Sequence, residues 1–125
     1  MPGFTFPMLE WSTSTAPAVG VAASVTRTAP ATGNSHVLTG VFATMFGTAT
    51  STLVTFSVTT TADNTLYRDG SVIGVLGNGD FVDRIHVPTL FIKGDDGQGL
   101  TAAFNTAGGA AVRQVITLKG VTVPS

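Results

Sequence analysis

The 125-residue chain contains no cysteine and little charge of either sign. Without cysteine there can be no disulfide, no thiol nucleophile and no Cys-ligated metal. Charged residues make up 10% of the chain, against roughly 25% in an average soluble domain. The net charge is −1, and the 6 basic residues are scattered rather than clustered as nucleic acid or an anionic membrane surface requires. The composition therefore predicts that neither nucleic acid nor a membrane is a partner.

Long apolar runs are also missing. No stretch approaches the roughly 20 apolar residues of a membrane span. No Lys or Arg precedes Arg27, and the N-terminal residues hold no continuous apolar run, so we expect no secretory signal. The mean hydropathy is nevertheless +0.38. This value indicates an apolar core together with uncharged surface, part of which is covered in an assembly.

The residues that are abundant predict an all-β fold. Threonine and valine favour strands, glycine favours turns, and no window has the apolar spacing of an amphipathic helix. We expect about eight antiparallel strands, drawn from residues 18–28, 35–46, 52–60, 66–68, 72–76, 80–87, 89–93, 100–105 and 112–123. Regular spacing with turn signals and no internal repeat indicates a sandwich. We predict a single jelly-roll β-sandwich, with an immunoglobulin-like sandwich as the alternative.

Alternation along three of these segments predicts which side chains face the core. In residues 52–60 the inward side chains are those of Val54, Phe56 and Val58. In residues 80–87, Phe81, Ile85 and Val87 lie on one face of the expected strand, and Val82, Arg84 and His86 lie on the other. Residues 35–46 are apolar on both faces, with Val37, Val41 and Met45 on one and Leu38, Phe42 and Phe46 on the other.

The first seventeen residues stand apart from this pattern. Prolines and a glycine exclude a helix there, and the only charge is Glu10. We therefore divide the chain into an extended apolar N-terminal arm, residues 1–17, and a β-sandwich domain, residues 18–125. Large apolar side chains that an arm cannot bury locally indicate burial by another surface. The predicted partner-binding residues are Phe4, Phe6, Met8, Leu9 and Trp11. The alternative is that this segment forms the first strand of its own domain.

The search for chemistry finds no catalytic motif. His36 and His86 each lie on an expected strand, but no G-x-S-x-G elbow accompanies them. We predict that both are hydrogen-bonding residues at the surface or between subunits. Gly94, Gly97 and Gly99 are followed by neither a helix nor a Lys-Ser/Thr pair, so they do not indicate a phosphate loop. We predict a non-enzymatic protein with no catalytic residue and no cofactor.

Four aspartates raise the question of a cation. Carboxylate oxygens are ligands that Ca²⁺ prefers, but the spacing does not match a calcium-binding loop. Asp-Asp-Gly is also an ordinary turn sequence. We predict no metal site, and whether a cation binds stays open for Asp80, Asp83, Asp95 and Asp96.

Two short stretches carry a resemblance to a known family. They are the hairpin LYRDGS at residues 66–71 and the ending formed by GQGL at 97–100 with the final strand VITLKGVTV at 115–123. Together with the cysteine-free composition, they resemble the small jelly-roll proteins of tailed bacteriophages that decorate or cement capsids.

The resemblance implies a virion structural protein on the outer capsid surface, made in the host cytoplasm. It would be a homotrimer whose partner is the major capsid protein. Related jelly rolls occur in phage tails and fibres, so a receptor- or carbohydrate-binding module is the alternative function.

Overall fold

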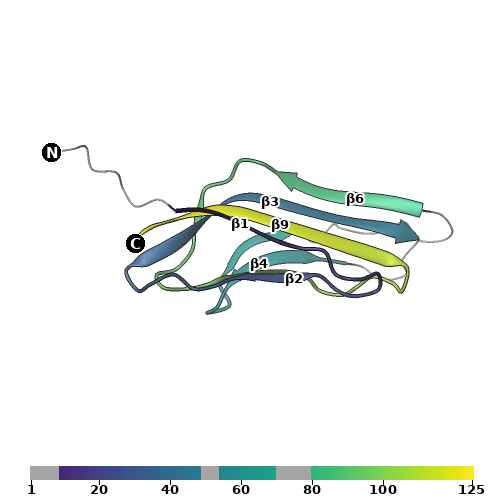
Figure 1. Ribbon diagram of the computed structural model, residues 1–125, viewed down its shortest axis with the longest axis horizontal. Helices are drawn as coiled ribbons and strands as arrows, with labels where there is room; N and C mark the ends of the chain where they lie inside the picture. Colours follow the sequence, from purple (N-terminus) through teal and green to yellow (C-terminus); the bar gives the residue numbers. More distant parts are fainter. Residues whose placement is uncertain (1–8, 49–53, 70–79) are drawn as a thin grey trace.

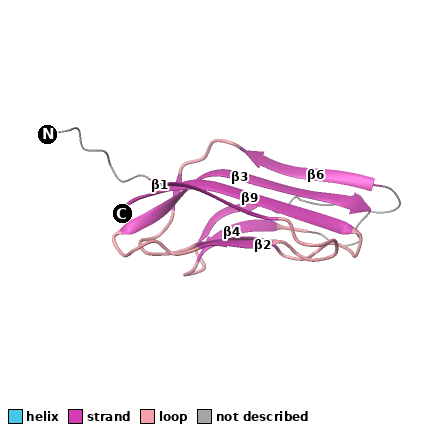
Figure 2. Ribbon diagram, viewed as in Figure 1, coloured by secondary structure: helices cyan, strands magenta, loops and turns pink. Residues whose placement is uncertain are grey.

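The computed structural model describes residues 9–48, 54–69 and 80–125. The strands in these ranges form two sheets that pack face to face (Figures 1 and 2). The described ranges contain no helix, and therefore none long and apolar enough to cross a membrane. The predicted all-β sandwich is confirmed.

The two sheets are named A and B. Sheet A follows the order β1-β9-β3-β6, with β7 also paired to β3. Its strands are β1 (Leu9–Thr15), β9 (Val112–Pro124), β3 (Asn34–Thr48), β6 (Asp80–Val87) and β7 (Ile92–Lys93). Sheet B follows the order β2-β8-β4-β5. Its strands are β2 (Ser24–Arg27), β8 (Leu100–Phe104), β4 (Phe56–Thr60) and β5 (Thr65–Asp69).

The strand pairing is that of one long hairpin wrapped into two layers. β1 pairs with β9, β2 with β8, β3 with β6 and β4 with β5, all antiparallel. Successive pairs lie alternately in sheet A and sheet B. This wrapping is the jelly-roll topology, and it distinguishes the fold from the immunoglobulin-like alternative. The predicted jelly roll is therefore confirmed.

The core lies between the sheets and is built from alternate residues. Val54, Phe56 and Val58 are fully buried, as their alternation predicts. Phe56 packs edge-on against Phe104 of the neighbouring strand, with ring centres 5.3 Å apart. Each such side chain stabilises the fold by about 1.5–3 kcal/mol through removal of apolar surface from water.

The faces of β3 are exchanged by a β-bulge between Leu38 and Gly40. An extra residue in one strand reverses the alternation on one side of it. Leu38, predicted to share a face with Phe42, therefore joins Met45 in the core, and Val37 takes the opposite face. The face prediction for residues 35–46 is wrong at this point because it counts alternation straight through the bulge.

A buried glutamine ties β9 to two connecting segments. Gln114 is fully buried. Its Oε1 accepts a hydrogen bond from the backbone N–H of Ala23 at 2.8 Å, and its Nε2 donates to the carbonyl of Thr106 at 2.7 Å. Both ends of the amide are thus satisfied, so the buried polar group does not carry the penalty of an unpaired one.

Replacing Gln114 by leucine leaves the two backbone groups unpaired. We expect the free energy of unfolding to fall by about 2–4 kcal/mol, because each unsatisfied buried group costs about 1–3 kcal/mol. Urea unfolding followed by circular dichroism measures the change. Thr117→Ser, on the outer face of the same strand, is the control and should shift it by less than about 0.5 kcal/mol. A Gln114→Leu protein as stable as the wild type would contradict this account.

Candidate functional site

The structure incorporates much of the predicted arm into sheet A. Leu9–Thr15 forms β1, which pairs antiparallel with β9 along its whole length. The predicted boundary after residue 17 is wrong for this segment, and the sandwich begins at Leu9. The physical reason is that Pro7 and Pro17 flank the strand rather than interrupt it, so every residue of β1 keeps its backbone donor. Here the alternative of a first strand is the correct one.

The five predicted partner-binding residues fall into three groups. Phe4, Phe6 and Met8 lie outside the described residues. Leu9 is 66% exposed at the start of β1, and its role in binding stays a prediction. Trp11 is only 7% exposed and belongs to the hydrophobic core. The prediction of Trp11 as an exposed anchor is therefore wrong, because its indole ring packs in the hydrophobic core.

Trp11 is buried because a glycine lies beside it. The register pairs Trp11 with Gly120 of β9, and a methyl group at Gly120 would overlap indole Cζ2 and the carbonyl oxygen of Val37. From sheet B, the guanidinium carbon of Arg27 lies 5.2 Å from the centre of the indole. His36 packs edge-on against it with ring centres 5.3 Å apart. We call Trp11, Gly120, Arg27 and His36 the indole cluster. It joins β1, β9 and β3 to a strand of the opposite sheet.

The hydrogen bonds of His36 show which ring nitrogen carries the proton. Nε2 lies 2.7 Å from the carbonyl oxygen of Thr28, which can only accept, so Nε2 is protonated. In the neutral ring Nδ1 then accepts from the Thr122 hydroxyl at 2.8 Å. Both nitrogens serve the fold, which leaves neither for acid–base chemistry on a substrate. The prediction of a surface histidine is wrong for His36, which is buried, whereas His86 is exposed.

The environment of His36 favours its neutral form. Burial lowers the pKa of His36 below the ordinary 6.5. The hydrogen bond to the Thr28 carbonyl raises the pKa by less than burial lowers it, and the charge of Arg27 lowers it further. A proton on this ring would also remove the acceptor that Nδ1 offers to Thr122.

The acidic loop uses its carboxylates to hold neighbouring turns. Asp95 accepts a hydrogen bond from the side-chain amide of Asn64. Asp96 accepts from the backbone N–H of Gly33 at 2.9 Å and from the hydroxyl of Ser125. These bonds link four segments at one end of the sandwich, so a structural role accounts for both carboxylates.

The other two aspartates of the proposed cation set belong to a distant part of sheet A. The N–H of Gly97 bonds the carbonyl of Asn34, which places the acidic loop at the start of β3. Asp83 is opposite Met45, which lies 11 residues further along β3, or roughly 36 Å at 3.3 Å per residue. The side chain of Asp80 lies outside the described residues. Among the described residues, no group of three or more His, Asp or Glu could hold a metal ion.

Comparison with known proteins identifies no family. No protein-family model matches the chain, and no curated protein matches it. Among solved structures, it is similar to part of an arabinose-bound α-L-arabinofuranosidase, MgGH51, with a TM-score of 0.34 and 8% sequence identity. The match covers 94% of this chain and 23% of that chain, so this chain spans about a quarter of that protein's length. A likeness this distant carries no argument about activity.

Gly120→Ala should displace the indole ring, because the added methyl group takes the space of Cζ2. We expect the free energy of unfolding to fall by about 1–3 kcal/mol, as for other overpacked cores. Trp11 is the single tryptophan of the chain, so its fluorescence should shift to the red as the ring is exposed. Gly109→Ala is the control, since a methyl group there would lie 3.5 Å from Val112 Cγ2 in ordinary contact. Unchanged fluorescence in Gly120→Ala would contradict the packing described.

Acid should weaken the fold through His36. Below about pH 6.5 the unfolded chain binds a proton that the folded chain, with its lowered pKa, does not, so the free energy of unfolding decreases. Above that pH the stabilisation that comes from the neutral His36 ring is fully present. Urea unfolding between about pH 7.5 and pH 5.5 measures the loss. His36→Gln should flatten the profile, and His86→Gln should retain it. Equal slopes for the wild type and His36→Gln would rule out His36 as the cause.

Proposed function

We propose that this chain is a non-enzymatic structural protein of a phage virion that decorates or cements the capsid. It is a homotrimer that binds the major capsid protein on the outer surface of the capsid. Residues 1–9 are the attachment segment. The jelly-roll fold, the weakly charged composition and the short sequence stretches that resemble phage decoration proteins support this proposal.

The observation that carries the proposal is the contrast between Leu9 and Trp11. Both belong to β1 and share a face by alternation, but the first is 66% exposed and the second is 7% exposed. Among the described residues of this strand, the core therefore ends at Trp11, and Leu9, which precedes it on the same face, stays exposed. Figure 1 shows β1 at the edge of sheet A, where it pairs with β9 alone.

The energetics suit attachment through many weak contacts. Burial of a large apolar side chain stabilises a complex by about 1.5–3 kcal/mol before the cost of ordering the segment. Phe4, Phe6 and Met8 together with Leu9 offer several such side chains. Many copies on one shell, each bound modestly, strengthen the shell through multivalency.

Deleting residues 2–8 tests the attachment segment without touching the core. The truncated protein keeps β1 and the indole cluster, so its free energy of unfolding should change by less than about 0.5 kcal/mol. Binding is measured by co-sedimentation with capsids assembled from the major capsid protein of the same phage genome. We expect the intact chain to bind and the truncated chain to lose binding.

A matched control separates the segment from exposed apolar surface in general. Full-length protein carrying Phe4→Ser, Phe6→Ser and Met8→Ser should behave like the truncation. Val19→Ser removes another apolar side chain that is 51% exposed and should bind as the wild type does. If the truncated chain binds capsids as well as the intact one, the segment is not the attachment site. If the intact chain binds no capsid, the proposed function is wrong.

A further inference from the structure

Sheet A presents an apolar strip on the side that faces away from sheet B. Phe46 of β3 and Val82 of β6 are directly opposite each other in the strand register and are 36% and 58% exposed. Phe42 is on the same side of β3 and packs edge-on against His86 of β6, with ring centres 5.0 Å apart. Opposed side chains in antiparallel strands are close enough to form one surface. The strip therefore continues across both strands.

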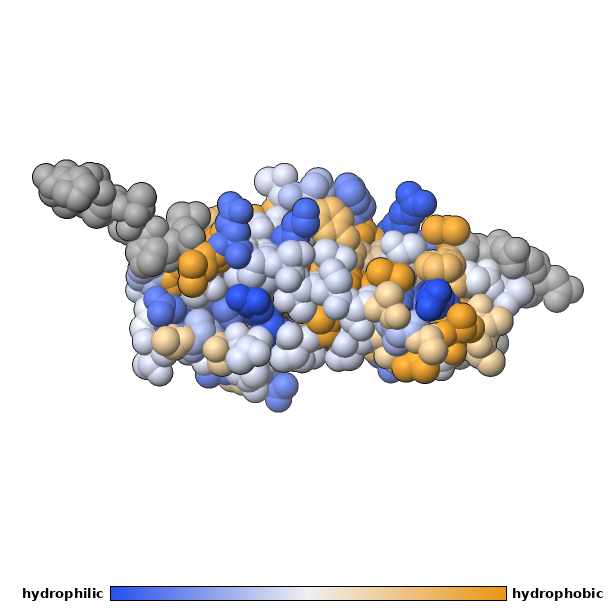
Figure 3. Space-filling model, viewed as in Figure 1, coloured by the Kyte–Doolittle hydropathy of each residue, from blue (hydrophilic) through white to orange (hydrophobic). Residues whose placement is uncertain are grey.

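Cations border this strip. Arg84 lies between Val82 and His86 on the same face of β6, and Arg113 of β9 is opposite Phe46. The Lys119 ammonium lies 5.6 Å from the centre of the Phe42 ring. We call Phe42, Phe46, Val82, Arg84, Arg113 and Lys119 the A-face. Figure 3 shows apolar and hydrophilic side chains mixed along this side of the molecule.

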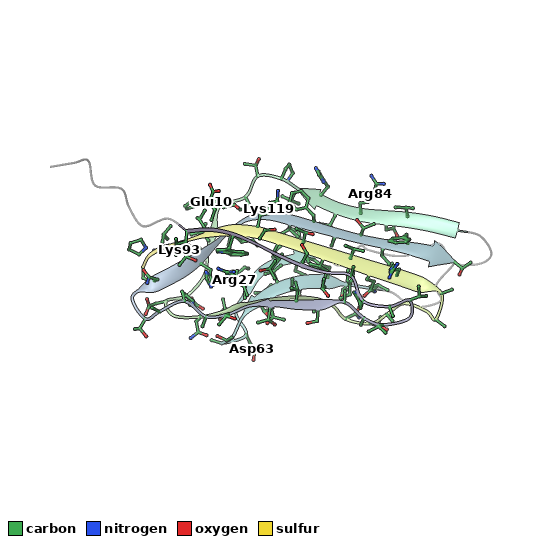
Figure 4. The ribbon with its side chains drawn as sticks, in the orientation of Figure 1. Glu10, Arg27, Asp63, Arg84, Lys93 and Lys119 are labelled. Atoms are coloured by element: carbon green, nitrogen blue, oxygen red, sulfur yellow. The ribbon has the colours of Figure 1, made fainter. Side chains whose placement is uncertain are left out.

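The described charges on the outer side of sheet A are mainly cationic. In Figure 4, Arg84 and Lys119 project from sheet A away from sheet B, whereas Asp63 projects from the opposite layer. Among the described side chains, Glu10 is the acidic group on the outer side of sheet A, and it lies at the β1 edge. The A-face is therefore cationic around an apolar centre.

A hollow of about 380 Å³ adjoins this face at its β1 side. It opens beside the β3 bulge, where Gly120 contributes no side chain. Its lining residues are Glu10, Trp11, Thr39, Lys119, Gly120 and Val121. Centrally buried anchors that fill such hollows dominate the energetics of protein interfaces. Lys119 belongs to both the hollow and the A-face, so a partner that covers the A-face can also fill the hollow.

We infer that the A-face docks on a protein surface that is acidic and carries apolar side chains. This inference rests on the proposed function, under which that surface belongs to the capsid. Charge complementarity selects this partner. A second A-face is a poorer occupant, because two copies placed face to face would bring their cations together. Nucleic acid fits poorly, since the centre of the face is apolar and only three cations surround it.

Charge reversal on opposite faces tests the inference. Arg84→Glu changes the A-face, and Arg68→Glu makes the same change on the exposed side of β5 in sheet B. Capsid binding by Arg84→Glu should weaken about tenfold, and that by Arg68→Glu by less than about twofold. Wild-type binding should weaken as ionic strength rises from about 0.01 M to 0.15 M, and Arg84→Glu should reduce that dependence. Val82→Ser provides a second, uncharged variant with the same expected loss.

The outcomes separate this inference from the proposed function. If Arg84→Glu and Val82→Ser bind like the wild type while the deletion of residues 2–8 abolishes binding, the inference is overturned and the function stands. If Arg84→Glu and Arg68→Glu weaken binding equally, only net charge acts and the inference is overturned. If Arg84→Glu instead dissociates a homo-oligomer in analytical ultracentrifugation, the A-face joins copies of the chain, which also overturns it. If the intact chain binds no capsid, both proposals fail.

Discussion

The packing of the Trp11 indole over Gly120 is the contact on which the two-layer architecture depends. It holds the first described strand against the last, and Arg27 and His36 extend the contact to the opposite sheet and to β3. The indole Nε1 has no hydrogen-bond partner among the described residues, so ring packing rather than polar bonding explains this residue. In a jelly roll, which is one long hairpin wrapped into two layers, sheet A is complete only when the outermost strands of that hairpin, β1 and β9, have paired. Trp11 supplies the apolar area for that closure, and Gly120 supplies the room.

Much of the fold follows from alternation and turn residues in the sequence. In residues 52–60 the period-2 pattern gives Val54, Phe56 and Val58 correctly as inward side chains, and Phe56–Thr60 forms β4. The expected last strand, residues 112–123, lies within β9. β1 is missed because its apolar alternation is limited to Leu9 and Trp11, in a stretch that prolines flank on both sides. A signal for it lies elsewhere in the chain, since a glycine inside a strand often marks the close approach of another group. Gly120, in a final strand rich in valine, isoleucine and threonine, is such a signal, but it does not identify Trp11 as the group that approaches.

The candidate site is only partly predictable for a related reason. The apolar N-terminal stretch predicts exposure for both Leu9 and Trp11, and only Leu9 is exposed. The A-face does not follow, because the side on which Phe42 and Phe46 lie depends on the bulge between Leu38 and Gly40. A strand that is apolar on both faces gives no sign of a one-residue shift. Only the pairing with β6 and β9 brings these rings together with Arg84 and Arg113 from distant parts of the chain.

The antiparallel pairing of β1 with β9 has a mechanical consequence. Residues 1–8 join β1 at Leu9, so a pull along the strand axis loads every backbone pair from Leu9 to Thr15 together, in shear. A slip of one residue would turn Trp11 out of the core, and a slip of two would bring the indole against Leu118 or Thr122 instead of Gly120. The side-chain packing therefore opposes sliding of β1 along β9. The force that the pair withstands is set by the rate at which the whole strand detaches rather than by the equilibrium stability of the domain.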